Sequence, residues 1–339
     1  MDFLRLGGQI VASALVVSLL PISAAIAAPS INEIQSRIRT LQEQAAVAGE
    51  AAQQAKVQYA SLMSKLESVQ KQVADDAATV AKFKNSLGAI AFEQYKNGTM
   101  SRSLELLFSS DPKLFLTAAG SLESVTKKQA IQLKQYSVAK QRMTATSLTV
   151  NDKLALAKKA QARFLAQEKS VMSKLAEAKT LFKSLSKAKQ ARLARLNKNS
   201  EKADKKKSLA VAAKSKLGRG RGAIALRYAI KQIGDRYVWG GAGMTVWDCS
   251  GLVLRAYEAA GVRLPHSAAV QARYGKAVSL SQIRPGDLVY FGSNRYISHI
   301  GIYVGKGQMV SAPRAGARVK IQSFTPNFGS LSYYGARRL

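Results

Sequence analysis

The stretch WDCSGLVLRAYEAAG, residues 247–261, decides the fold of the C-terminal part of the chain. Its apolar residues have helical spacing, and Gly261 suits the position just after a helix C-terminus. Asp248 is a favourable N-cap, so the helix is predicted to begin at Cys249. The partial positive charge of a helix N-terminus favours the thiolate, which is the nucleophilic form of cysteine. The segment therefore predicts a reactive Cys249, with a small buried apolar residue as the alternative interpretation.

A base for this cysteine is predicted on a strand. His299 lies in SHIGIYV, residues 298–304, which alternates like a half-buried strand, and PGDLVYF, residues 285–291, reads as the strand before it. A histidine on a sheet that faces a helix N-terminus is the Cys–His arrangement of papain-like enzymes. The other histidine, His266, follows the helix in a loop. A solvent-exposed side chain is the favoured interpretation there, in preference to a catalytic role.

Several motifs in this region resemble the NlpC family of cell-wall cysteine peptidases, over nearly all of residues 219–339. They are Tyr237, Asp248-Cys-Ser-Gly251, Leu264-Pro-His-Ser267, Pro285-Gly-Asp-Leu288 and His299-Ile-Gly-Ile-Tyr303. The resemblance implies an α+β papain-like domain in which helices pack on an antiparallel sheet. It also implies cleavage of peptidoglycan stem peptides, usually after γ-D-glutamate and often before diaminopimelate.

The resemblance assigns catalytic roles to matched positions. Cys249 matches the nucleophile, His299 the general base, and Tyr237 the tyrosine whose hydroxyl helps to stabilise the oxyanion. Ser311, twelve residues after His299, departs from the family pattern, which usually has histidine or another strongly polar residue there. A serine hydroxyl can hold an imidazole through one hydrogen bond but lacks the charge of a carboxylate. Ser311 is therefore the candidate for orienting His299, with a backbone carbonyl as the alternative.

The resemblance also implies residues that bind substrate. Asp248 and Ser250 match cleft positions that contact the stem peptide. Trp239 and His266 are further candidates for lining the cleft.

The N-terminal half is predicted to form two long helices. Asn97-Gly98 is a turn signal that ends the first helix, and Asp111-Pro112 is a second break, so a second helix is expected from about Ser121. Asp76 interrupts the apolar seam, and residues 45–60 are alanine-rich and weakly patterned. Heptad-spaced apolar residues run through 31–41, 62–73, 80–90 and 164–185.

Helices of this pattern must bury their seams against each other, against another copy or against a partner protein. Two of them joined by a broken apolar segment suggest an all-α coiled-coil hairpin. It is either a passive spacer or a regulatory arm with Leu104–Leu116 as its contact patch. The run from Phe92 to Asp111 resembles the coiled-coil regions of division-associated wall hydrolases of the PcsB and RipC kind. That resemblance implies an arm that docks on the FtsEX membrane complex and restrains the enzyme.

The expected organisation has four parts. Residues 1–28 read as a signal peptide, with an apolar stretch and a small-residue cleavage pattern at Ala25-Ile26-Ala27. The helical region is expected over 29–200, a basic flexible linker over 201–222 and the peptidase domain over 223–339.

Composition narrows the function further. The formal net charge of +32 attracts polyanions, among which an exported protein meets wall polymers rather than DNA. The single cysteine excludes an internal disulfide, and no metal-ligand cluster or nucleotide loop is recognisable, so no cofactor is expected. The sequence thus predicts a secreted, wall-associated peptidoglycan endopeptidase. A non-catalytic wall adaptor and a papain-like amidase or acyltransferase are the alternatives.

Overall fold

The computed structural model describes residues 30–97, 112–215, 217–293, 296–324 and 327–339. The expected signal peptide and residues 104–111 of the expected contact patch lie outside them.

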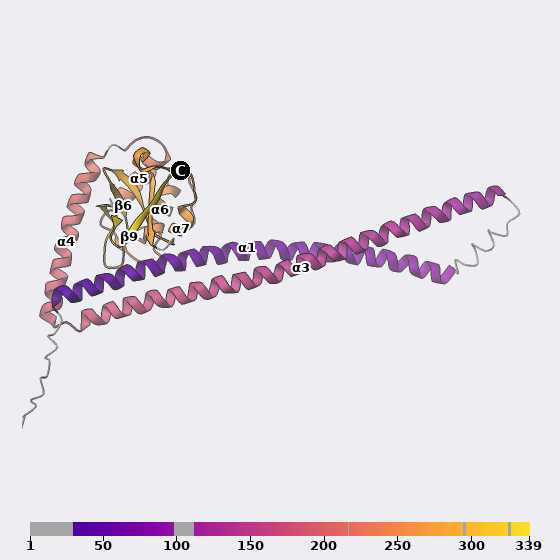
Figure 1. Ribbon diagram of the computed structural model, residues 1–339, viewed down its shortest axis with the longest axis horizontal. Helices are drawn as coiled ribbons and strands as arrows, with labels where there is room; N and C mark the ends of the chain where they lie inside the picture. Colours follow the sequence, from indigo (N-terminus) through magenta and orange to yellow (C-terminus); the bar gives the residue numbers. More distant parts are fainter. Residues whose placement is uncertain (1–29, 98–111, 216, 294–295, 325–326) are drawn as a thin grey trace, which may run out of the picture.

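A long antiparallel hairpin forms the N-terminal half, as predicted (Figure 1). Its two helices are α1 (Ile31–Asn97) and α3 (Pro112–Lys183), of 67 and 72 residues. At 1.5 Å per residue each is about 100 Å long. The first helix is continuous up to Asn97, the last residue described before residue 112. The second begins at Pro112 and not near Ser121, because proline is well suited to the first turn of a helix.

A buried polar contact joins the two helices of the hairpin. Asp76 of α1 accepts a hydrogen bond from Thr146 of α3 at 3.0 Å and pairs with Arg142 at 3.1 Å. Its side chain is buried, although neighbouring Asp75 is exposed. The interruption of the apolar seam at Asp76 is therefore a specific contact across the hairpin.

The C-terminal part is an α+β domain, as predicted. Its helices are α5 (Arg221–Lys231), α6 (Cys249–Glu258), α7 (Ala268–Gln271) and the short 3-10 helix η1 (Leu280–Gln282). Its strands are β1 (Arg236–Tyr237), β2 (Val246–Trp247), β3 (Lys276–Val278), β4 (Leu288–Ser293), β5 (Tyr296–Gly305), β6 (Gln308–Ser311), β7 (Lys320–Ser323), β8 (Asn327–Phe328) and β9 (Leu331–Arg338).

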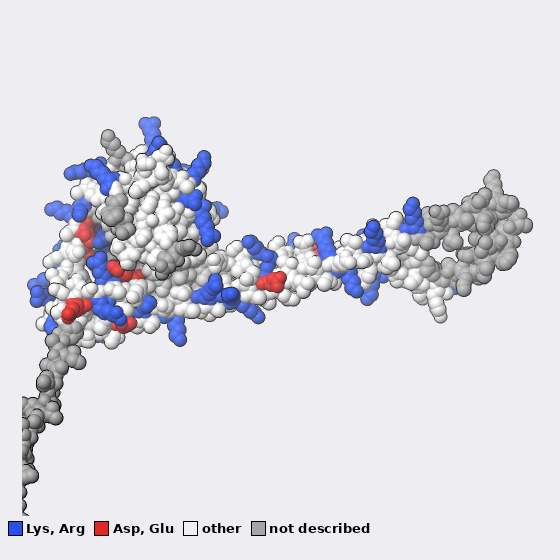
Figure 2. All heavy atoms as spheres, in the orientation of Figure 1, with Lys and Arg blue, Asp and Glu red and all other residues white. Residues whose placement is uncertain are grey.

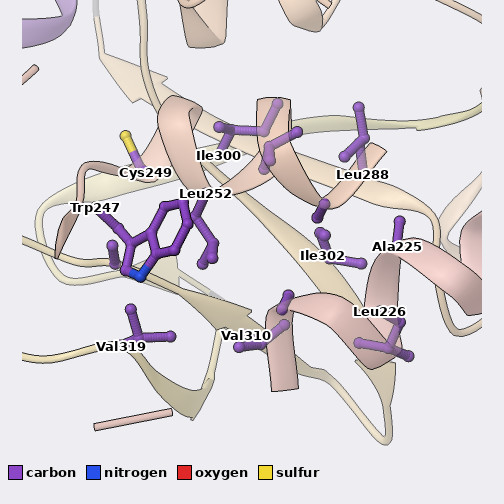
Figure 3. Close-up of a cluster of buried hydrophobic side chains, with 14 of the residues drawn as sticks. Ala225, Leu226, Trp247, Cys249, Leu252, Leu288, Ile300, Ile302, Val310 and Val319 are labelled. Carbon is purple, nitrogen blue, oxygen red and sulfur yellow. The ribbon is translucent and has the colours of Figure 1, made fainter. Parts of the chain in front are cut away.

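The main sheet is antiparallel throughout its described strands, in the order β3-β9-β4-β5-β6-β7, with β8 beside β9. Helices α5 and α6 pack on one face of it. Figure 3 shows Leu252 of α6 and Ile300 and Ile302 of β5 in one apolar cluster, with Cys249 at the end of α6. Burial of each such side chain contributes about 1.5–3 kcal/mol, so the helix that carries the cysteine is firmly fixed to the strand that carries the histidine.

Helix α4 (Lys187–Lys214) occupies much of the segment expected to be a flexible linker, and that expectation is wrong for residues 201–214. The lysines and alanines there are good helix formers. One side of α4 also packs on the domain: Ser208 is fully buried and accepts a hydrogen bond from β7 at 3.0 Å. Asp204 adds an ion pair to Lys320 at 2.9 Å.

Basic side chains are distributed over the hairpin and the domain, with few acidic ones among them (Figure 2). Among the helices of the described residues, none combines the length and apolar character that crossing a membrane requires.

Candidate active site

Cys249 is the first residue of α6, as the sequence predicts. Asp248 is the N-cap, and its carboxylate accepts a hydrogen bond from the backbone N–H of Gly251 at 2.7 Å. A Cβ at position 251 would lie 2.0 Å from the carbonyl oxygen of Gly241, so only glycine fits this turn. The helix cap thus accounts for Asp248, the first residue of the Asp-Cys-Ser-Gly motif, and the tight turn accounts for Gly251, its last residue.

His299 lies on β5, directly before Ile300, whose backbone faces Cys249. The backbone N–H of Ile300 hydrogen-bonds to the Cys249 sulfur, which brings the thiol to the strand that carries the imidazole. His299 is buried, and this burial lowers its pKa to about 3. Its imidazole is therefore neutral at ordinary pH in the docked arrangement.

Three neighbours orient the imidazole of His299. Its Nε2 lies 3.2 Å from Ser311 Oγ, which accepts a hydrogen bond from the amide of Gln322 at 2.9 Å. The ring stacks on Phe328, with centroids 4.3 Å apart and planes 9° from parallel. With Gln322 already donating to Ser311, the hydroxyl oxygen can accept from Nε2–H, which leaves Nδ1 unprotonated.

The predicted oxyanion residue Tyr237 and the predicted substrate-binding residues Asp248 and His266 lie around Cys249. Tyr237 is buried on β1, and its burial together with the nearby charge of Asp248 raises its pKa well above the usual range, so its hydroxyl remains a donor. His266 Nε2 lies 2.8 Å from Asp248 Oδ1. Burial opposes protonation of His266, but its hydrogen bond to Asp248 outweighs that effect and the pKa is raised. His266 is therefore half-buried in the cleft and not an exposed loop residue.

A glutamate from the hairpin occupies this cleft, which the sequence did not reveal. The Glu50 carboxyl group of α1 accepts hydrogen bonds from the Cys249 thiol at 3.1 Å and from the backbone N–H of Ala268 at 2.8 Å, and it shares a hydrogen bond of 2.6 Å with the Ser250 hydroxyl. Glu50 is only 3% exposed. The side chain therefore lies on the candidate nucleophile and makes substrate access impossible while the helix is docked.

Trp239 contacts α1 next to this point. A Cβ on Gly49 would lie 2.4 Å from the indole ring, so glycine at this position is what allows the tryptophan against the helix backbone. The small residues Ala45, Ala48 and Ala52 are buried in the same part of α1. The alanine-rich segment 45–60 is weakly patterned because it faces the domain as well as α3.

The docked helix changes the chemistry of the cysteine. Burial, followed by the charges of Glu50 and Asp248, raises the pKa of the Cys249 thiol well above its usual range. This outweighs the effect of the helix N-terminus, from which a thiolate was expected. In the docked arrangement the thiol is protonated and acts as a hydrogen-bond donor to Glu50.

The other side of the cleft is less completely filled. A cavity of about 620 Å³ lies between α1 and the strand of His299, with Tyr296, Ser298 and Phe328 in its lining. The arm thus seals the Cys249 side more tightly than the His299 side.

The residues singled out from the sequence form two groups. Tyr237, Asp248, Ser250 and His266 lie around Cys249, and His299 lies beside Ser311, while Trp239 packs against Gly49 of the arm. Sequence reasoning missed Glu50 and Gly49 on the arm, and Gln322 and Phe328 around His299. Only Gly49 left a signal, as a glycine within a predicted long helix, where it costs stability unless something packs against it.

Comparison with known proteins finds relatives of the C-terminal part of the chain. Residues 234–338 match the model of the NlpC/P60 family. A probable endopeptidase of Mycobacterium tuberculosis is 44% identical over 110 residues, which cover 32% of this chain and 27% of that protein. The peptidoglycan endopeptidase RipA of the same organism is 37% identical over 117 residues, 31% of this chain and 25% of RipA.

Among solved structures, the NlpC/p60 domain of the peptidoglycan hydrolase SagA is 33% identical, with a TM-score of 0.32, over 35% of this chain and 98% of that domain. The chain spans 27% or less of the length of these curated relatives. Residues 234–338, with Cys249 and His299 at their centre, are an NlpC/P60 domain.

Proposed function

We propose that the chain is a secreted peptidoglycan endopeptidase that cuts stem peptides after γ-D-glutamate, with the α1–α3 hairpin as its regulatory arm. The main support for the peptidase is the position of Cys249 at the N-terminus of α6, hydrogen-bonded to the strand that carries His299. The names of the relatives, probable endopeptidase and peptidoglycan endopeptidase, favour the same reaction.

Catalysis in this proposal takes place in the undocked cleft. His299 accepts the proton of the Cys249 thiol, and the thiolate attacks the carbonyl carbon of the scissile bond. The hydroxyl of Tyr237 and the N–H groups at the start of α6 donate to the oxygen that becomes negative. His299 then protonates the leaving amine, and a water molecule hydrolyses the thioester in a second step.

The regulatory role of the arm is supported by Glu50. Its three hydrogen bonds end on the thiol, on the hydroxyl of Ser250 and on the N–H of Ala268, so the helix covers the atoms that a substrate must reach. A passive spacer would have no need of this contact or of the close fit between Gly49 and Trp239. The arm therefore restrains the peptidase until it is moved.

Secretion and the partner of the arm rest on sequence alone. The signal-like residues 1–28 support export to the cell wall, and the resemblance of residues 92–111 supports docking on a membrane complex of the FtsEX type.

The peptidase is tested with purified peptidoglycan and mass spectrometry of the released muropeptides. The full chain carrying Glu50→Ala should release fragments that end in γ-D-glutamate, and Cys249→Ala in the same chain should release none. Equal release by the double variant would exclude a Cys249 nucleophile and leave the adaptor as the function. Cleavage at another bond, such as the amide to muramic acid, would establish an amidase.

A further inference from the structure

The carboxyl group of Glu50 is buried beside a second carboxyl group, and one hydroxyl connects them. Ser250 Oγ lies 2.6 Å from Glu50 Oε1 and 3.2 Å from Asp248 Oδ1. A serine hydroxyl has one proton, so it can donate to only one of these two oxygens. If both groups were ionised, the other oxygen would face a lone pair across a hydrogen-bond distance. The geometry therefore calls for one additional proton.

That proton belongs on Glu50. Asp248 accepts hydrogen bonds from the backbone N–H groups of Gly251 at 2.7 Å and Gly240 at 2.9 Å, and it also contacts His266 at 2.8 Å. Several donors therefore already converge on the oxygens of Asp248, which act as acceptors. Glu50 has no cationic side chain among its hydrogen-bond partners in the described residues, and burial followed by the charge of Asp248 raises its pKa.

We propose that Glu50 closes the cleft as a neutral acid, donating its proton to Ser250, which in turn donates to Asp248, so that docking of the arm takes up a proton and rising pH releases it. This inference rests on the proposed restraint of the peptidase by the arm, and it adds that the restraint holds best at acid pH. In the undocked arm Glu50 is exposed, with a pKa of about 4.3. The docked form binds more protons, so it is most stable at acid pH and weakens by about tenfold per pH unit up to the pKa of docked Glu50.

Other titratable groups face the same place and must be separated from Glu50. Besides Asp248, they are Cys249 from α6, His266 from the loop before α7, Tyr237 from β1 and Tyr296 from β5, while Lys56 on α1 acts on His266. A substitution that removes the titration of Glu50 alone distinguishes its effect from that of these other groups. Glu50→Gln does so, because its amide can donate to Ser250 while its carbonyl accepts from Ala268, as the neutral acid does.

The test is the rate at which iodoacetamide alkylates Cys249 in the full chain between pH 4 and 9, for wild type and Glu50→Gln. Iodoacetamide reaches Cys249 only when the arm is open, and at low iodoacetamide concentration the arm recloses faster than the thiol reacts. Each rate is then the opening equilibrium multiplied by the reactivity of the free thiol, and the ratio of the wild-type rate to the Glu50→Gln rate cancels the ionisation of the thiol and of the other groups. The wild-type rate divided by the Glu50→Gln rate should be close to one at pH 4. It should rise about tenfold per pH unit until it reaches a plateau. Glu67→Gln, the same change at an exposed position of α1, should behave as wild type.

A ratio that stays constant with pH would overturn the neutral latch. So would a Glu50→Gln chain that is alkylated as fast as Glu50→Ala at every pH, because the cleft would then require the anion. The measurement needs no peptidase activity, so its outcome is independent of whether the chain cleaves peptidoglycan. Circular dichroism of each variant checks that the helices are intact.

Discussion

At the scale of single residues, the imidazole of His299 is oriented without a carboxylate. Ser311 lies within hydrogen-bond distance of Nε2, Gln322 fixes the hydroxyl of Ser311, and Phe328 stacks on the ring. The hydrogen bond is a contact between neutral groups in the docked form, while the stacking holds the plane of the ring. Loss of the hydroxyl should therefore weaken the orientation of the base without removing it.

Ser311→Ala should lower kcat/KM for peptidoglycan fragments about two- to tenfold, since a hydrogen bond of this kind contributes about 0.5–1.5 kcal/mol. The effect should fall on kcat, and it is measured in the Glu50→Ala chain so that the arm does not limit the rate. An unchanged kcat would mean that Phe328 alone orients the ring. A loss as large as that of His299→Ala would mean that the hydroxyl is indispensable.

At the scale of elements, the sequence predicts the parts that follow local rules. The helix at Cys249 and the strand at His299 come from periodicity and capping, and the structure confirms them. The contact between Glu50 and Cys249 joins residues 199 positions apart, for which no local pattern exists. The linker expectation failed for a related reason, since the burial of Ser208 depends on a partner distant in sequence.

Gly49 offers a test in which helix stability and docking change in opposite directions. Gly49→Ala should stabilise α1 by about 0.5–1 kcal/mol, because alanine is the better helix former. The same Cβ meets Trp239 at 2.4 Å, so docking should weaken and alkylation of Cys249 should accelerate at least tenfold. Gly88→Ala on the same helix, with nothing within 4 Å, should give the gain in helicity alone. Equal alkylation rates for the two variants would contradict the docked arrangement.

Asp76 offers a second test, at the contact between α1 and α3. Asp76→Ala removes the partner of Arg142 and Thr146 and should lower the stability of the hairpin by about 1–3 kcal/mol, seen as earlier loss of helicity in urea. Asp75→Ala removes an exposed carboxylate next to it and should change stability by less than about 0.5 kcal/mol. Similar losses for both would show that the charge of the segment matters and not the buried contact.

At the scale of the whole molecule, the domain lies against α1 at its cleft and against α4 at β7 (Figure 1). The ion pairs of α4, Glu201 with Arg318 and Asp204 with Lys320, are partly exposed, and each contributes at most about 1 kcal/mol. The turn at residues 184–186 separates α4 from the hairpin. The domain is therefore held by two separate contacts, one on α1 and one on α4.

The central claim is that a peptidase is held closed by Glu50, and the rate of muropeptide release from purified peptidoglycan tests it most directly. The full chain with Glu50→Ala should release muropeptides at least tenfold faster than wild type, the equivalent of about 1.4 kcal/mol of lost restraint. Glu67→Ala should match wild type. A Glu50→Ala chain no faster than wild type, with its Cys249 fully accessible to alkylation, would contradict the account.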